Sequence, residues 1–141
     1  MELNKKDLIF ETKHWRITLT SDQTYLGRSY MDLKGERGSL SELTQEEIID
    51  FFEFVKKFES TLKRAFGAVM FNWTCLMNDA YKEKPYNPHV HFHVRPRYDK
   101  EVEFAGETFA DPNFAEHYKR GVKREVSDEI RKQIIEKIKK V

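Results

Sequence analysis

The sequence predicts an α+β fold in which an antiparallel sheet carries one main helix packed on it, plus a C-terminal helix. Three observations favour this class. Several short segments alternate apolar and polar residues with the period of a strand, and one long segment has helical periodicity with signals at both ends. Two of the strands also follow each other across a loop that contains no helix, which is typical of antiparallel pairing.

Three strands are expected before the main helix, at residues 8–10, 15–19 and 28–33. In the third of these, Ser29, Met31 and Leu33 fall on one face, because alternate residues of a strand point the same way. A turn-rich stretch with two glycines follows and separates this part of the chain from the helix.

The main helix has a signal at each end. Thr44 and Glu47 form a capping box, in which each side chain satisfies a free backbone amide of the other residue. Gly67 is expected to end the helix, because glycine readily adopts the left-handed conformation found there. The apolar residues between these ends recur at helical spacing: Ile48, Phe51, Phe52, Val55, Phe58, Leu62 and Phe66.

The second half of the chain begins with a strand over residues 69–77 and continues with a polar loop over residues 78–88. A strand with three histidines follows, and we expect Pro96 to end it. We expect these two strands to pair antiparallel. Ser127 caps a last helix with a narrow apolar stripe of Ile130, Ile134 and Ile138.

The composition sets limits on location and partners. The length of 141 residues fits a single domain over residues 1–141. A net charge of +1 gives no support for a general nucleic-acid-binding surface, which would carry a basic excess. No apolar run has the length of a signal peptide or a membrane span, and a single cysteine forms no intrachain disulfide. We therefore expect a cytoplasmic protein without a nucleic-acid or membrane partner.

The chemistry is expected at residues 89–93, which read His-Val-His-Phe-His. Strict alternation directs Val90 and Phe92 into a core and His89, His91 and His93 to the other face of the strand. Neighbouring histidines in such a column lie roughly 6–7 Å apart. Histidine is the side chain that acts as a nucleophile, a proton carrier or a metal ligand near neutral pH.

Four interpretations of the column follow from the residues alone. The first is a solvated strand face without a function. The second is a metal site, in which two histidines bind zinc; the outer pair is roughly 13 Å apart, so a third ligand would come from His14, His117 or a carboxylate. The third is covalent catalysis, in which the middle imidazole attacks phosphorus while its neighbours contact the phosphate and the leaving group. The fourth is phosphate binding without turnover.

The run from His89 to Arg95, followed by Pro96, resembles the motif of the histidine triad (HIT) superfamily, His-φ-His-φ-His-φ-φ with φ apolar. Only Arg95 departs from this pattern. A capped helix, a strand, an asparagine, a loop and the triad strand also follow in the order typical of the superfamily. The resemblance covers a core of about residues 8–98 and leaves residues 99–141 as a C-terminal extension. It implies a HIT-like fold.

The resemblance also implies residue roles. His91 corresponds to the nucleophile, which forms a nucleotidyl-histidine intermediate that water hydrolyses. His93 corresponds to the histidine that contacts the phosphate and supports the leaving group, and His89 completes the hydrogen-bonded array. Asn78 corresponds to a phosphate-binding position, although an asparagine at a strand end also forms turns. Arg28, after Gly27, stands where the family often has Gly-His, and it either binds phosphate or is a solvated strand residue.

Some features fit the family less well or have less direct roles. The usual Gly-Gln with a following Ser or Thr is replaced by Lys-Pro-Tyr-Asn-Pro at residues 84–88. Lys82 and Lys84 lie in the loop before the triad and are placed to attract anions. Arg95 and Arg97 are expected to lie off the histidine face, on a solvated edge.

The implied activity is that of a nucleotide hydrolase. It would cleave dinucleoside polyphosphates such as diadenosine tetraphosphate, or related phosphoanhydrides and phosphoramidates, at the α-phosphate. No cofactor is required, although Mg²⁺ can accompany a polyphosphate. A homodimer is expected. The alternatives are a nucleotidyltransferase or phosphorylase of the same superfamily and a non-catalytic nucleotide-binding module.

Overall fold

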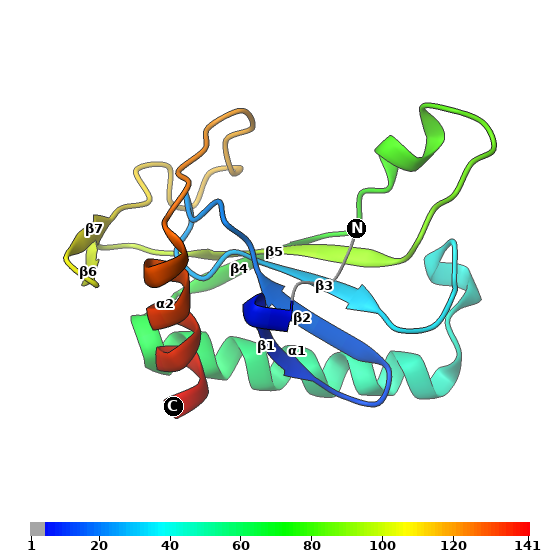
Figure 1. The fold of residues 1–141 in the computed structure, drawn as a ribbon, viewed down its shortest axis with the longest axis horizontal. Helices are drawn as coiled ribbons and strands as arrows, with labels where there is room; N and C mark the ends of the chain where they lie inside the picture. The colour runs from blue at the N-terminus through cyan, green and yellow to red at the C-terminus, as the bar shows by residue number, and fades with distance from the viewer. Residues whose placement is uncertain (1–4) are drawn as a thin grey trace.

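The structure, a computed structural model, describes residues 5–141. Five strands form one antiparallel sheet in the order β1-β2-β3-β5-β4 (Figure 1). They are β1 (Leu8–Glu11), β2 (Trp15–Leu19), β3 (Ser29–Leu33), β4 (Met70–Thr74) and β5 (His91–Arg97). The expected antiparallel pairing of β4 with β5 is confirmed. The histidine strand β5 therefore lies inside the sheet, between β3 and β4.

The main helix, α1 (Gln45–Phe66), covers one face of the sheet (Figure 1). The capping box is confirmed: the Thr44 hydroxyl accepts from the Glu47 amide, and the Glu47 carboxylate accepts from the Thr44 amide. Gly67 ends the helix in the left-handed conformation at φ 78°. Trp15 of β2 donates its indole N–H to the Glu47 carbonyl at 2.9 Å, which fixes the start of the helix against the sheet.

The predicted apolar stripe of α1 is wrong at two positions. Ile48 and Phe52 are 41% and 60% exposed, whereas Phe54 is 2% exposed. Residues two positions apart lie roughly 200° apart around a helix, so Phe52 and Phe54 cannot both face the sheet. The core face instead follows Phe54, Phe58 and Leu62.

The rest of the chain includes a second helix, a hairpin and three short 3-10 turns. Helix α2 (Asp128–Lys140) begins at Ser127, whose hydroxyl accepts from the Ile130 amide. The hairpin of β6 (Val102–Phe104) and β7 (Glu107–Phe109) was not predicted from the sequence. The 3-10 turns are η1 (Lys5–Asp7), η2 (Leu40–Glu42) and η3 (Asn78–Tyr81). Within the described residues, neither helix combines the length and apolar character needed to cross a bilayer.

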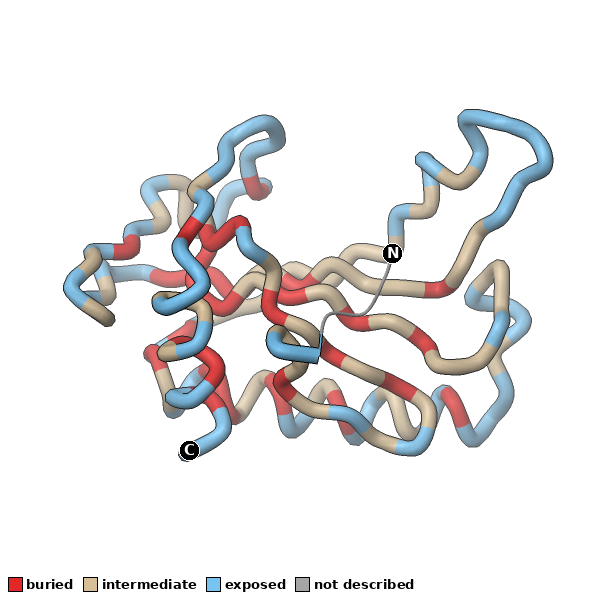
Figure 2. Tube along the Cα trace, viewed as in Figure 1, coloured by how far each residue is buried: buried red, intermediate tan, exposed pale blue. Residues whose placement is uncertain are grey.

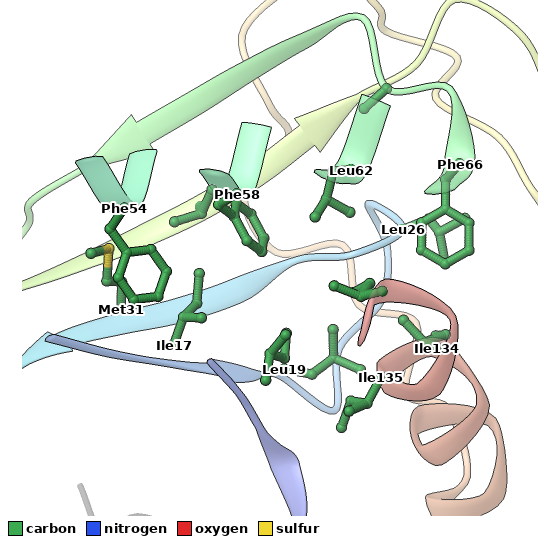
Figure 3. Close-up of a cluster of buried hydrophobic side chains, with 14 of the residues drawn as sticks. Ile17, Leu19, Leu26, Met31, Phe54, Phe58, Leu62, Phe66, Ile134 and Ile135 are labelled. Carbon is green, nitrogen blue, oxygen red and sulfur yellow. The ribbon is translucent and has the colours of Figure 1, made fainter. Parts of the chain in front are cut away.

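The core lies between the sheet and the two helices. Figure 3 shows residues of β2 and β3, the apolar face of α1 and the isoleucines of α2 meeting in one cluster. Its labelled members are Ile17, Leu19, Leu26, Met31, Phe54, Phe58, Leu62, Phe66, Ile134 and Ile135. Burial of this cluster fixes which face of the sheet is inward, and so leaves the histidine face outward.

Two irregular segments rise on the side of the sheet opposite α1 (Figure 1). One contains η3 and the polar loop before β5, and the other is the stretch before α2. Both are largely exposed along their length (Figure 2). They flank the outer face of the sheet, where the histidines project.

Candidate active site

The alternation expected of the histidine strand is confirmed. Val90 and Val94 are fully buried, and the Phe92 ring lies 4.6 Å from the Phe51 ring of α1. His91 and His93, on the alternate positions of β5, therefore project from the outer face. His89 precedes the strand, so the column contains two strand residues and one residue from the loop that leads into it.

The His91 ring is held in one tautomer by the backbone. Its Nδ1 lies 2.7 Å from the His89 carbonyl oxygen. Because a carbonyl only accepts, Nδ1 carries the proton and donates it, and the neutral ring keeps a lone pair on Nε2. His89 is fixed in a similar way, since its Nε2 donates to the Leu33 carbonyl oxygen at 2.7 Å. The arrangement leaves His91 Nε2 free to act as a nucleophile or a ligand.

His93 is the most perturbed histidine of the site. Its ring lies 5.2 Å from the His91 ring, almost perpendicular to it at 84°. Burial, followed by electrostatic interactions with His91, Arg95 and Arg28, lowers the pKa of His93 to about 4. His93 is therefore neutral near pH 7, and its buried Nδ1 has no hydrogen-bonding partner within the described chain.

Tyr30 is a site residue that the sequence reasoning missed. It lies opposite His93 in the pairing of β3 with β5. Its ring stacks on His91 at 4.9 Å and 19°, and it meets the edge of His93 at 5.4 Å. Burial raises the pKa of Tyr30 to about 12, so its hydroxyl stays protonated. The inward direction of Ser29 and Met31 already placed Tyr30 on the outer face, but the neighbouring strand was not predicted.

A cavity of about 360 Å³ opens over the three histidines, and we call it the histidine cavity. It is lined by Tyr30, Leu76, Met77, Asp79, Ala80, Asn87, His89, His91 and His93. The start of η3 and the end of the polar loop thus form its outer wall. Asn78, the predicted phosphate ligand, is exposed at the first position of η3 and does not line this cavity, whereas Asn87 does.

A second cavity of about 230 Å³ adjoins the first, and we call it the basic cavity. It is lined by Asp22, Thr24, Tyr25, Arg28, Thr74, Leu76, His93, Arg95, Tyr118, Lys119, Arg120, Gly121, Val122 and Lys123. His93 and Leu76 line both cavities, so His93 stands at their boundary. Arg28, the other predicted phosphate ligand, lies here and forms an ion pair with Asp22.

The expectation that Arg95 and Arg97 lie off the histidine face is wrong. Residues 91, 93, 95 and 97 share one parity, and β5 continues through Pro96 to Arg97, so alternation keeps all four on one side. Arg95 lies beside His93 in the basic cavity, with its guanidinium carbon 3.8 Å from the centre of the Tyr118 ring. Arg97 is fully buried and binds Asp111.

The strand continues past Pro96 because of the sheet order. The pairing of β5 with β3 ends at Val94, while the pairing with β4 extends to Arg97. At Pro96 the strand therefore has a neighbour on one side only. A proline, which lacks the backbone N–H, is tolerated where a strand is paired on one side.

The remaining candidates line neither cavity. Lys82 is exposed and pairs with Asp79 at 2.7 Å, and Lys84 lies near the Tyr86 ring. His14 and His117, considered above as further zinc ligands, line neither cavity. Within residues 5–141, no group of three or more His, Cys, Asp or Glu side chains is arranged to hold a metal ion.

Comparisons with known proteins rest on structure. No protein-family model matches the sequence, and no curated protein matches it significantly. Among solved structures, a hypothetical histidine triad nucleotide-binding protein from Sulfolobus tokodaii matches with a TM-score of 0.66 at 15% identity, over 95% of this chain and 81% of that one. A diadenosine triphosphate hydrolase from Plasmodium falciparum matches with a TM-score of 0.67 at 17% identity, over 99% and 78%.

A uridylyltransferase matches with a TM-score of 0.63 at 19% identity, over 97% of this chain but 41% of that chain. These identities are low, and what they establish is the shared architecture. The chain therefore has the histidine triad fold that its His-Val-His-Phe-His motif led us to expect.

Proposed function

We propose that the protein is a nucleotide hydrolase that cleaves phosphoanhydrides or phosphoramidates at the α-phosphate through a nucleotidyl-histidine intermediate on His91. The observation that carries this proposal is the hydrogen bond from His91 Nδ1 to the His89 carbonyl oxygen at 2.7 Å. It leaves the Nε2 lone pair available in a cavity large enough for a phosphate and part of a nucleoside.

The reaction has two steps. His91 Nε2 attacks the α-phosphorus, a P–N bond forms, and the bond to the leaving group breaks with its electron pair on the departing oxygen or nitrogen. Water then attacks the same phosphorus, the P–N bond breaks, and the nucleoside monophosphate and the original imidazole are released. In the first step the leaving group takes any proton it needs from solvent as it departs, and in the second step the proton lost by the attacking water goes to solvent.

Neighbouring side chains support the two steps. His93 is neutral near pH 7 and lies beside His91, so it can hydrogen-bond to the phosphate or the leaving group. A neutral His93 also adds no positive charge beside the His91 ring, which becomes cationic when Nε2 bonds to phosphorus. Tyr30 stacks on the His91 ring and limits its rotation. His89, which precedes β5, is held in place by the hydrogen bond from its ring to the Leu33 carbonyl oxygen. We also propose Arg28 and Asn78 as phosphate ligands. The proposal for Arg28 has more direct support, because Arg28 lines the basic cavity together with His93, whereas Asn78 is exposed.

The test compares wild type with His91→Ala on a panel of adenosine and guanosine polyphosphates and phosphoramidates. We expect nucleoside monophosphate from wild type and a loss of kcat of about 10³-fold or more in His91→Ala, because a missing nucleophile removes the first step. His14→Ala is the matched control, since that ring lies outside both cavities. Equal activity in wild type and His91→Ala would refute the nucleophile assignment.

Mass spectrometry gives an independent test. A reaction quenched without acid and digested is expected to carry a nucleotide adduct on the peptide that contains His91, because the P–N bond is acid-labile. An adduct found repeatedly on another residue would contradict the mechanism.

The similarity to a uridylyltransferase favours one second candidate, a nucleotidyltransferase or phosphorylase. In that case inorganic phosphate or another acceptor replaces water in the second step. Product analysis with and without phosphate separates the two: a nucleoside diphosphate that forms only with phosphate identifies a phosphorylase. Treatment with EDTA, assayed on a phosphoramidate, tests the zinc alternative, and we expect activity to persist.

The homodimer expected from the family resemblance is also a proposal. Light scattering coupled to size-exclusion chromatography tests it, and a mass near twice that of the 16.9 kDa chain is the expected result. A mass of one chain would contradict it.

A further inference from the structure

The basic cavity carries a large excess of positive charge. Five of its lining residues are cationic: Arg28, Arg95, Lys119, Arg120 and Lys123. Asp22 is the one carboxylate among them. In a chain whose net charge is +1, this concentration at one concave site is a local feature and does not reflect the composition.

The single carboxylate is already engaged. Asp22 pairs with Arg28 and also accepts from the Thr24 hydroxyl and from the Arg124 amide. Arg95 forms no ion pair with a carboxylate in the described part of the chain, and its guanidinium lies over the Tyr118 ring instead. Burial, and then the charge of Arg28, lower the pKa of Arg95. Arg95 therefore lacks a counter-charge of its own.

Unpartnered polar atoms gather at the same cavity. Of the five buried side-chain polar atoms without a hydrogen-bonding partner within residues 5–141, four belong to residues that line it. They are Arg28 Nε, Thr74 Oγ1, His93 Nδ1 and Arg95 Nη1. Buried polar groups are normally hydrogen-bonded, and a concentration of exceptions marks a place where a ligand supplies the partners. A ligand with several anionic oxygens matches donors from arginine, histidine and threonine.

The position of the cavity relates it to the reaction. His93 lines both cavities, so a phosphate chain attached at His91 reaches the basic cavity by passing His93. The far wall is the segment from Tyr118 to Lys123, which the backbone ties to the loop before β3. The Lys119 amide donates to the Tyr25 hydroxyl at 2.9 Å, and just after the wall the Arg124 carbonyl oxygen accepts from the Gln23 amide at 2.8 Å. The wall is therefore a fixed part of the fold.

We propose that the basic cavity binds the phosphates of the leaving group, so that the preferred substrates carry at least two phosphates beyond the one that His91 attacks. This inference rests on the proposed function and narrows its substrate class to nucleotides with a polyanionic leaving group. Arg95 and Arg28 contact the phosphate next to His93, and the lysines and arginine of the wall meet the more distant charge.

Direct binding tests the cavity without turnover. The probe is inorganic tripolyphosphate, titrated into the full-length protein by calorimetry. Two variants remove charge from the cavity, Arg95→Gln and the triple variant of Lys119, Arg120 and Lys123 to Gln. The matched control replaces three exposed lysines elsewhere, Lys56, Lys63 and Lys100, by Gln and so removes the same charge. We expect about tenfold weaker binding or more in each cavity variant and about twofold or less in the control.

Each outcome of the titration either supports or refutes anion binding in the basic cavity. Equal weakening in the cavity triple and the control triple would overturn it, because tripolyphosphate then senses only overall charge. No detectable binding to wild type would overturn it as well. Arg95→Lys is expected to recover part of the affinity lost in Arg95→Gln, since it restores the positive charge but not the planar guanidinium group with its paired N–H donors. The triple variant changes only exposed side chains and is expected to fold. It therefore still tests the cavity if Arg95→Gln does not fold.

Kinetics then separate this inference from the proposed function. The two substrates are diadenosine tetraphosphate, with a polyanionic leaving group, and adenosine 5′-phosphoramidate, with a neutral one. We expect kcat/KM for diadenosine tetraphosphate, divided by kcat/KM for the phosphoramidate, to fall about tenfold in Arg95→Gln. Most of this fall is expected to come from a higher KM for the tetraphosphate. Equal losses on both substrates would refute the subsite and leave the hydrolase intact. If wild type cleaves neither substrate while tripolyphosphate binding depends on Arg95, the proposed function fails and the anion site stands.

Discussion

Replacement of Asp111 by Ala is expected to destabilise the protein severely, because it leaves the buried Arg97 without its carboxylate partner. The Arg97 side chain is 0% exposed and that of Asp111 is 2% exposed. All five N–H groups of Arg97 have a partner: Nε and Nη2 donate to the Asp111 carboxylate at 2.6 and 3.0 Å, and the other three donate to Asn72 Oδ1 and to the carbonyl oxygens of Asn113 and Glu116 at 2.8 Å.

The magnitude follows from what the substitution leaves behind. Removing one partner of a buried ion pair leaves an uncompensated charge in a medium of low polarity, which costs about 3–5 kcal/mol of the free energy of unfolding. Asp111 also accepts from the Tyr98 amide at 3.2 Å, so Ala leaves a second buried donor without a partner. A small domain has about 5–15 kcal/mol of total stability, so Asp111→Ala removes a large fraction of it.

Urea unfolding followed by tryptophan fluorescence and by circular dichroism measures the effect. The control is Glu107→Ala, which breaks the half-exposed pair with Arg124 at 3.7 Å and is expected to cost about 1 kcal/mol or less. The double replacement Arg97→Met with Asp111→Leu is expected to be more stable than Asp111→Ala alone, since it removes the unpaired charge. A loss below about 1 kcal/mol in Asp111→Ala would show that the pair is solvated and would refute this reasoning.

Three further predictions concern single residues. An NMR titration is expected to give His93 a pKa near 4 that rises in Arg95→Gln, and an unchanged value would show that Arg95 does not act on the ring. Because this pKa lies below the unfolded value of 6.5, the unfolded state binds the proton first, so stability falls as pH drops from about 6.5 to about 4. Thr44→Ala is expected to cost about 1 kcal/mol of unfolding free energy in a urea titration, with Thr44→Ser close to wild type. Gly27→Ala is expected to lower the melting temperature more than Gly67→Ala: both have positive φ, but only at Gly27 does the new Cβ meet a side-chain methyl of α1, at 2.6 Å.

Much of the fold was predictable because its signals are local. The capping residue Thr44 and the terminating Gly67 define α1 within a few positions, and Ser127 does the same for α2. The strands follow from alternation. The order of the strands is not local, and the sequence did not indicate that β3 lies beside β5. The continuation through Pro96 was equally unexpected, because it depends on where the two pairings end: β3 pairs with β5 only as far as Val94, whereas β4 pairs with it as far as Arg97.

The site was predictable to the extent that it lies on one strand. Alternation placed His91 and His93 on the outer face, and the same rule, applied to odd-numbered positions, also identifies Arg95. Tyr30 required knowledge of the pairing between β3 and β5. The wall formed by residues 118–123 required more, because the segment has no periodicity and its position depends on hydrogen bonds to residues about a hundred positions earlier, such as Asp22.

That long-range connection has a consequence for the order in which the protein acquires its properties during synthesis. The Arg124 amide reaches back across 102 residues to the Asp22 carboxylate, and the backbone amide of Gln23 donates to the Arg124 carbonyl at 2.8 Å. Contacts so distant in sequence form late. The histidine cavity is lined by residues between Tyr30 and His93, whereas the basic cavity also requires residues 118–123. We therefore expect the basic cavity to be completed after the histidine cavity.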